Sequence, residues 1–479
     1  MVERMLHLAP GANIGPSAVL NEVHAAAERI ARAAGSGNAH AARILKDGSG
    51  NEAVAFIDAE RCGIDASDRA RLLQLDRELV ALAILAGRLG AAGEALDRVL
   101  AKEPDDLDAL AWQGYIHHRN GDTEAAAALF RLVYERSDKE AGDQCKVCVN
   151  LGSAYLELGK FDDAEKMYRE AQSIFEQRND QQLVADVRGR MGDVFFERGD
   201  LRKAEEFYNT ALKSNKLLGL NEAVAIDCAR LGRLLHALGD MRGAEAMFRE
   251  SLKHNKRAGL LNDAASDYES LATLRAERGD FDGAVAMQRR ALRIYEQLGD
   301  RTGVAIGYGN IGASMKASGD IAGAEEMYRK ALAIDKEIGR LEGIAVNCAN
   351  LGYLLEERGE ISEARKLYMS VLEMEESPGR PDVFAACGER IADLAISRGD
   401  LDGAEELLSQ LLMLARDDDL DQVVAKCCSN LGLIKIKRGD SSGANRDLTK
   451  ARNLFNRLGD MDEVKRVDGL LAELEDDNP

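Results

Sequence analysis

The stretch SRGDLDGAEELL, from Ser397 to Leu408, contains an Arg-Gly-Asp tripeptide that the chain carries four times. The other three copies start at Arg198, Arg278 and Arg438. Consecutive copies are therefore 80, 120 and 40 residues apart, and every spacing is a multiple of 40. A surface ligand for cell adhesion would not explain that regularity, which instead predicts an internal repeat.

A frame of 40 residues that begins at Cys145 aligns eight copies of one pattern. The fifteenth place of every copy is glycine: Gly159, Gly199, Gly239, Gly279, Gly319, Gly359, Gly399 and Gly439. The twentieth place is always alanine: Ala164, Ala204, Ala244, Ala284, Ala324, Ala364, Ala404 and Ala444. The eighth place is glycine or alanine: Gly152, Gly192, Gly232, Ala272, Gly312, Gly352, Ala392 and Gly432. The twenty-fourth place is aromatic in five of the eight copies.

Each copy reads as two helices joined by a short turn. Apolar residues recur mostly at places 4, 7, 10 and 11, and again at places 17, 20, 24, 27 and 28, which is helical spacing. The glycine at place 15 suits the left-handed residue that ends a helix, and the acid that usually follows suits the N-cap of the next. In the opening stretch we therefore expect Gly399 to end one helix and Asp400 to cap another. A glycine at place 35 is expected to end the second helix in six copies: Gly219, Gly259, Gly299, Gly339, Gly379 and Gly459.

The pattern continues upstream at shorter spacings, with glycines at Gly121 and Gly87. We predict about ten helix pairs over residues 73–464, two of 34–38 residues and then eight of 40 residues from residue 145. Residues 1–72 are predicted to form a helical or partly flexible region, and residues 465–479 a capping helix and an acidic tail. The predicted fold class is all-α.

These residues resemble the tetratricopeptide repeat family, through an apolar and a small residue at places 7 and 8, glycine at place 15 and alanine at place 20. The 40-residue form, with NLG in the first helix and LGD closing the second, is similar to the Pins/LGN-type polarity adaptors and the kinesin light chains. The resemblance implies a right-handed superhelical solenoid of antiparallel helix pairs and no enzymatic activity. One departure is the family's proline at place 32, which is present only as Pro104.

The composition argues against several classes of function. The net charge of −20 is unsuited to binding phosphates, so we expect no nucleic-acid partner. The chain lacks an apolar run of 18 or more residues, so we expect no membrane insertion, and its eight scattered cysteines favour a cytoplasmic protein. Cys145 and Cys148 have no second pair with matching spacing and are predicted to be buried rather than metal ligands. Without a catalytic motif, we expect no enzyme activity, metal or cofactor.

The resemblance also implies that the first helix of each pair lines a concave groove that holds a segment of a partner protein. At place 6 we therefore predict the peptide-binding residues Asn150, Arg190, Arg230, Asn310, Asn350, Arg390 and Asn430. An asparagine amide can donate to and accept from a peptide backbone, and an arginine fork can hold a carboxylate or a phosphate. The alternative is that place 6 simply requires a polar residue of middling size.

Arg233 and His236 extend this set, because they follow Arg230 at intervals of three along one helix. With Arg190 they form a candidate site for an acidic group or a C-terminal carboxylate. The alternative is that Asp193 and Glu197 neutralise this patch. The rest of the face leans acidic, at Glu269, Glu277, Glu356, Glu357, Glu389 and Asp393.

The sequence thus predicts a protein–protein interaction scaffold that binds a peptide segment of a still unidentified partner. The alternative is a regulatory or chaperone protein that binds a signalling peptide or a client and changes its curvature. Both readings place the binding residues on the first helices.

Overall fold

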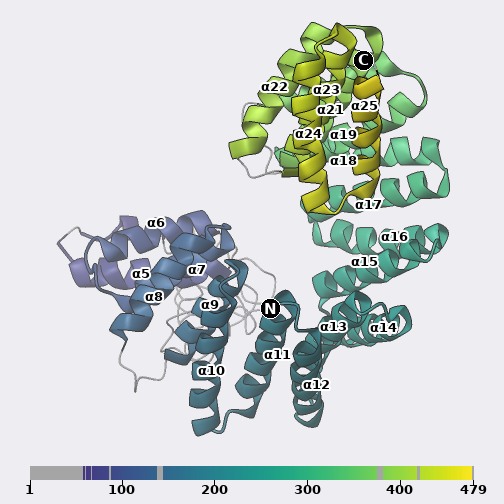
Figure 1. Cartoon of the computed structure of the whole chain (residues 1–479). Coiled ribbons are helices and arrows are strands. Elements are labelled where there is room, and N and C mark those ends of the chain that lie inside the picture. Colours follow the sequence, from purple (N-terminus) through teal and green to yellow (C-terminus); the bar gives the residue numbers. More distant parts are fainter. Residues whose placement is uncertain are drawn as a thin grey trace. The chain divides into compact units, whose positions relative to one another are not determined.

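The computed structural model describes residues 58–476 apart from 60, 66, 86–87, 138–143, 375–380 and 418–420. Most of the predicted N-terminal region 1–72, the end of the acidic tail and Gly379 therefore lie outside the described residues. The described part is all helical, as predicted, and carries no strand (Figure 1). None of its helices is long and apolar enough to cross a membrane.

The chain divides into two compact units, residues 1–254 and 255–479. The helices of the first unit are α5 (Arg69–Leu85), α6 (Leu89–Leu100), α7 (Leu107–Arg119), α8 (Thr123–Arg136), α9 (Gln144–Glu157), α10 (Phe161–Gln177), α11 (Gln181–Glu197), α12 (Leu201–Leu217) and α13 (Asn221–Ala237). Helix α14 (Met241–Ala258) contains the boundary between the units.

The second unit contains the remaining helices, which continue the same alternation of first and second helices. They are α15 (Leu261–Glu277), α16 (Phe281–Leu298), α17 (Arg301–Ser318), α18 (Ile321–Ile338), α19 (Leu341–Glu357), α20 (Ile361–Leu372), α21 (Pro381–Arg398), α22 (Leu401–Asp417), α23 (Asp421–Arg438), α24 (Ser441–Leu458) and α25 (Met461–Asp476). Within each unit, consecutive helices pack on each other as a solenoid of repeats.

The turn within each pair is built as the sequence predicts. The eight glycines at place 15 all have positive φ, between 68° and 88°. At the opening stretch, Gly399 has φ 82°, and the backbone N–H of Gly403 donates to Asp400 Oδ1 at 3.2 Å. The Asp400 carboxylate is therefore engaged as an N-cap. Five of the six glycines at place 35 also have positive φ, between 70° and 75°.

The small residues at place 8 make room for the residue at place 24 of the same pair. A Cβ atom on Gly192 would lie 2.5 Å from the Tyr208 ring, closer than real Cβ contacts allow. Four other pairs show the same close approach: Gly152 with Tyr168, Gly232 with Phe248, Gly312 with Tyr328 and Gly352 with Tyr368. The four tyrosines are fully buried and are among the largest side chains of the core.

Candidate functional site

First helices of successive pairs contact one another within each unit, as α11 does with α13 and α17 with α19. This packing brings place 6 of one first helix close to the side chains of the preceding first helix. Arg230, for example, bonds Asp193, which precedes it by 37 residues, and Asn430 bonds Asp393 at the same interval. The predicted binding residues therefore share one face of each unit, formed by the first helices.

Arg230 is held by carboxylates of the protein itself. Its Nη2 donates to Asp193 Oδ2 at 2.7 Å, its Nε lies 3.1 Å from both oxygens of Asp193, and its Nη1 lies 3.3 Å from Asp227 Oδ1. Only 11% of the Arg230 side chain is exposed. Arg190 is similarly engaged, because it donates to Asp186 at 2.9 Å and to the Ser153 hydroxyl at 3.2 Å.

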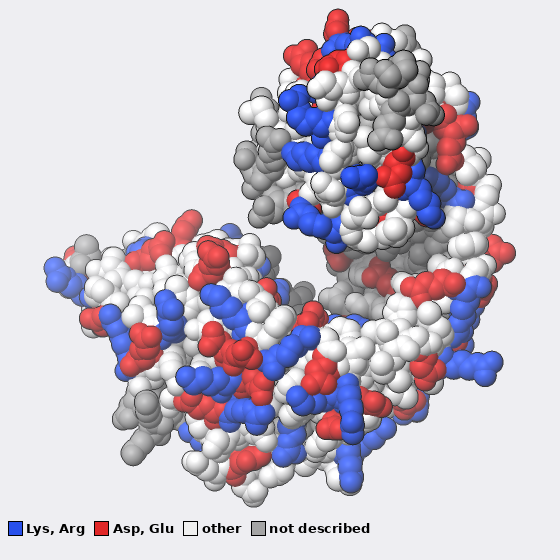
Figure 2. Space-filling model, viewed as in Figure 1, with Lys and Arg blue, Asp and Glu red and all other residues white. Residues whose placement is uncertain are grey.

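Arg233 is the more exposed member of the predicted basic patch, with 58% of its side chain accessible and its guanidinium 3.9 Å from Asp193. His236 is half-buried on the same helix. Figure 2 shows basic and acidic side chains interspersed over α9 to α12. Asp193 therefore pairs with Arg230 and lies near Arg233, whereas Glu197, the other acid of the alternative interpretation, forms no ion pair with any described residue.

In the second unit, Arg390 and Asn430 are also engaged within the protein. Arg390 forms an ion pair with Glu356, and its guanidinium lies 5.1 Å from the centre of the Tyr353 ring. Asn430 is 7% exposed and donates to Asp393 at 2.9 Å. These contacts link the first helices α19, α21 and α23 to one another, so both residues have a structural role.

Three asparagines at place 6 differ from the rest because their side-chain amides form no hydrogen bond with any described residue. Asn310 and Asn350 lie on the neighbouring helices α17 and α19, where Asn310 is exposed and Asn350 half-buried. Asn150 on α9 has a buried Nδ2 without an acceptor in the described part of the chain. A buried amide without a partner is costly, and an unpaired exposed amide is open to a ligand. These three residues are therefore the best candidates among the predicted set.

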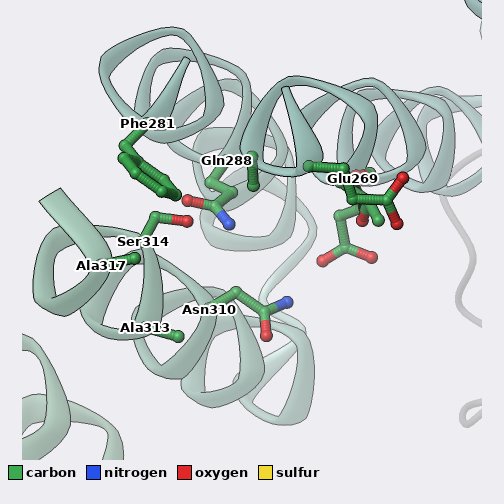
Figure 3. A pocket seen from close by; sticks show the side chains of 10 residues that line it. Glu269, Phe281, Gln288, Asn310, Ala313, Ser314 and Ala317 are labelled. Atoms are coloured by element: carbon green, nitrogen blue, oxygen red, sulfur yellow. Dashed lines mark hydrogen bonds between the residues drawn. The ribbon is translucent and has the colours of Figure 1, made fainter. Parts of the chain in front are cut away.

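A cavity of about 290 Å³ opens on the first-helix face of the second unit (Figure 3). Helix α15 contributes Glu269, Thr273, Ala276 and Glu277, helix α16 contributes Phe281 and Gln288, and helix α17 contributes Asn310, Ala313, Ser314 and Ala317. Figure 3 shows the Gln288 amide between Phe281 and Ser314, with Glu269 beyond it and Asn310 on the opposite helix. One predicted binding residue, Asn310, thus lies at the edge of this cavity.

The cavity lies in the one pair of the second unit that has glutamine at place 24. In the pairs with tyrosine, the ring fills the space beside the first helix. The hydroxyls of Tyr208 and Tyr368 also donate to that helix, to Asp193 at 2.9 Å and to Glu356 at 3.0 Å. Gln288 stands at this place and Ala272 at the matching place 8. Because glutamine lacks a ring, space remains next to Thr273 and Ser314. Gln288 was not among the predicted binding residues, although its departure from the aromatic pattern at place 24 is visible in the sequence.

The lining of the cavity is rich in hydrogen-bond acceptors. Gln288 Oε1 is buried and has no hydrogen-bond partner among the described residues. Burial raises the pKa of Glu269, while a hydrogen bond from the Tyr295 hydroxyl opposes that rise. No lysine, arginine or histidine is among the ten described residues of the lining. The cavity therefore suits a group that donates hydrogen bonds.

The cysteines show no sign of a metal centre in the described part of the chain. All eight are free, and seven of them, including Cys145 and Cys148, are buried. Burial raises the pKa of the Cys148 thiol above its ordinary value, as expected for a thiol in the core. The described residues contain no group of three or more His, Cys, Asp or Glu side chains that could hold a metal ion.

Comparison with protein families matches two models, both described as tetratricopeptide repeat. One covers residues 144–216, 222–297 and 262–337, and the other covers residues 81–141, so together they span just over half of the chain. No curated protein matches the sequence.

Several solved structures are similar to parts of the chain. BtubC (BKLC) from P. vanneervenii is 27% identical, with a TM-score of 0.38, and the match covers 51% of this chain and 92% of that one. The apo form of the quorum sensor NprR from B. thuringiensis is 12% identical, with a TM-score of 0.49, over 75% of this chain and 98% of that one. A signal transduction ATPase with a tetratricopeptide repeat sensor, from Pyrococcus horikoshii, is 16% identical, with a TM-score of 0.48, over 68% of this chain and only 52% of its own length.

Proposed function

The chain belongs to the tetratricopeptide repeat family, and we propose that it is a protein–protein interaction scaffold that binds an extended segment of a partner protein on its first-helix face. The observation that carries the proposal is the pair of unpaired amides at Asn310 and Asn350. They occupy the same place in successive repeats, on first helices that contact each other. We assign the chain no enzymatic activity and no cofactor.

Asparagine is suited to this role because one side chain carries both a donor and an acceptor. It can pair with the N–H and C=O groups of a peptide backbone whatever the side chains of that peptide are. Packed helices lie about 8–10 Å apart, and an extended chain advances about 3.3 Å per residue. Two such amides on neighbouring helices would therefore hold backbone groups about three residues apart.

The arginines of the predicted set have a different role in this proposal. Arg190, Arg230 and Arg390 already bond carboxylates of the protein, so recruiting one of them for a ligand would leave an acid without its partner. Arg233 keeps most of its side chain exposed and could contact an acidic residue of the partner. In this proposal, hydrogen bonds from the asparagines to the partner's backbone contribute most of the binding affinity, and charged contacts contribute less.

Selection of phage-displayed random peptides on the purified full chain tests this function. We expect enriched peptides that slow hydrogen exchange of backbone amides in α17 and α19 more than in the second helix α18. A selection that enriches no peptide would contradict the proposal. Protection confined to second helices would contradict it as well.

A further inference from the structure

The cavity between α15, α16 and α17 has a chemistry that the backbone-binding asparagines do not use. We propose that it receives the guanidinium group of an arginine side chain from the bound partner segment. This inference rests on the proposed function, because Asn310 belongs both to the peptide-binding face and to the edge of the cavity. A segment held by Asn310 could direct a neighbouring side chain into the space beside it.

The charge of the lining favours a cation. Glu269 provides a carboxylate, Thr273 and Ser314 provide hydroxyls, and no basic side chain is among the described lining residues. Glu269, Thr273 and Glu277 follow one another at intervals of four along α15, so they share one face of that helix. An anionic ligand would meet the like charge of Glu269 here, whereas a cation would meet an opposite charge.

An unsatisfied acceptor provides an independent reason for a donor ligand. Gln288 Oε1 is buried and receives no hydrogen bond from the described residues. A buried acceptor left without a donor costs about 1–3 kcal/mol. A ligand N–H group that reached this oxygen would remove that cost, so Gln288 favours a ligand that donates hydrogen bonds.

Arginine fits these demands better than lysine does. Its planar guanidinium carries five N–H donors and can bond a carboxylate and an amide oxygen at once, whereas an ammonium is a compact point charge. The alanines of the lining offer an apolar wall for the stem of the side chain, and the Phe281 ring can lie against the guanidinium. The volume of about 290 Å³ lies at the lower end of ligand pockets, which suits one side chain rather than a larger molecule.

The chain itself supplies a variant that closes the cavity. Where a tyrosine stands at place 24, place 8 is glycine, whereas here the pair is Ala272 and Gln288. The double variant A272G/Q288Y restores the combination of the tyrosine-containing repeats and should place a ring in the cavity without disturbing the fold. A second variant, E269Q, keeps the cavity open and removes one charge.

Ligand-observed saturation-transfer NMR with N-acetyl-L-arginine amide tests the assignment on the full chain. We expect the probe to bind the wild-type protein, to bind E269Q more than tenfold more weakly, and to give no signal with A272G/Q288Y. The citrulline analogue, which has the same shape without the charge, should not bind. Equal binding of the arginine probe to A272G/Q288Y, or equal binding of the citrulline or capped lysine probe to the wild-type protein, would overturn the proposal.

The same experiment separates this inference from the proposed function. The probe has no peptide segment beyond its caps, so N350A should bind it as the wild-type protein does. Probe binding without any enriched phage peptide would contradict the scaffold and leave the cavity assignment standing. If the selection enriches peptides but the arginine probe gives no saturation-transfer signal, only the cavity assignment is overturned.

Discussion

Asn215 donates its Nδ2–H to Asp227 Oδ2 at 2.7 Å, and both side chains are almost completely buried where α12 meets α13. The second unit repeats this contact between Asn255 and Asp267 at 2.8 Å. At the start of α19 the two residue types exchange places, and Asn347 donates to Asp335 at 2.8 Å. A buried polar pair at the same two places of the frame therefore recurs where one repeat meets the next.

This pairing has a consequence for stability as a function of pH. Burial, only partly offset by Arg230 and Asn215, raises the pKa of Asp227 to about 6 from the ordinary value of 3.8. The folded protein thus binds the proton more tightly than the unfolded chain does. The stability that Asp227 contributes is complete below about pH 4 and is lost as pH rises through about 6.

The variant D227N removes that titration. Between pH 4 and pH 7, we expect the wild-type protein to lose stability on the order of 2 kcal/mol relative to D227N. Chemical denaturation at each pH, followed by circular dichroism, measures the difference. If the free energies of unfolding of the wild-type protein and of D227N changed in parallel over this pH range, Asp227 would titrate as an ordinary exposed acid.

The contact between Gly192 and Tyr208 predicts a strong preference for glycine at place 8. A Cβ on Gly192 would lie 2.5 Å from two atoms of a buried ring, so G192A should destabilise the first unit by about 1–3 kcal/mol. Gly93 in α6 is a matched control, since its Cβ would have no atom within 4 Å. G93A should stabilise the protein by about 0.5–1 kcal/mol through helix propensity. Equal effects of the two substitutions on the thermal midpoint would contradict this packing.

The engagement of Arg230 by Asp193 predicts a structural role for the basic patch. D193N leaves a nearly buried guanidinium without its main carboxylate, so we expect a loss of about 2–4 kcal/mol of stability. D162N is the control, because Asp162 is 98% exposed and its ion pair with Arg198 should contribute less than about 1 kcal/mol. If denaturant midpoints moved equally in both variants, the Arg230 contact would be no more than a surface ion pair.

The buried cysteines predict how the native protein reacts with a thiol reagent. Cys62 is exposed, whereas burial raises the pKa of Cys387 and of Cys427 to about 12. We therefore expect one fast-reacting thiol per native chain with Ellman's reagent and eight after denaturation. C62S should abolish the fast phase. A fast thiol that remained in C62S would show that one of the seven buried cysteines is accessible in the native protein.

The helical architecture could be predicted from the sequence because its signals are local. Gly399 and Asp400 illustrate this point: a residue that needs positive φ and a residue that caps a helix stand next to each other, and both act within one turn of the chain. The same two places repeat at a fixed interval, so the turn recognised in one copy predicts the turns in the other copies. Predicting these turns required no knowledge of how one repeat packs on the next.

Whether the side chains of the candidate binding residues are already paired within the protein could not be predicted in the same way. Whether Arg230 is available depends on Asp193, which is 37 residues earlier and reaches it only through the packing of α11 on α13. The sequence left that question open between a free patch and a neutralised one. The cavity at Gln288 was missed for a related reason, because a missing ring has consequences only beside the side chains of neighbouring helices.

The central claim is that unpaired asparagines on the first helices hold the backbone of a partner segment. Calorimetric measurement of the dissociation constant of one selected peptide for the wild-type chain, for N310A/N350A and for N456A tests it most directly. Asn456 is an exposed asparagine on the second helix α24 and serves as the matched control. We expect binding to weaken more than tenfold in N310A/N350A and to stay unchanged in N456A. Equal affinity of all three proteins, with unfolding midpoints unchanged, would contradict the account.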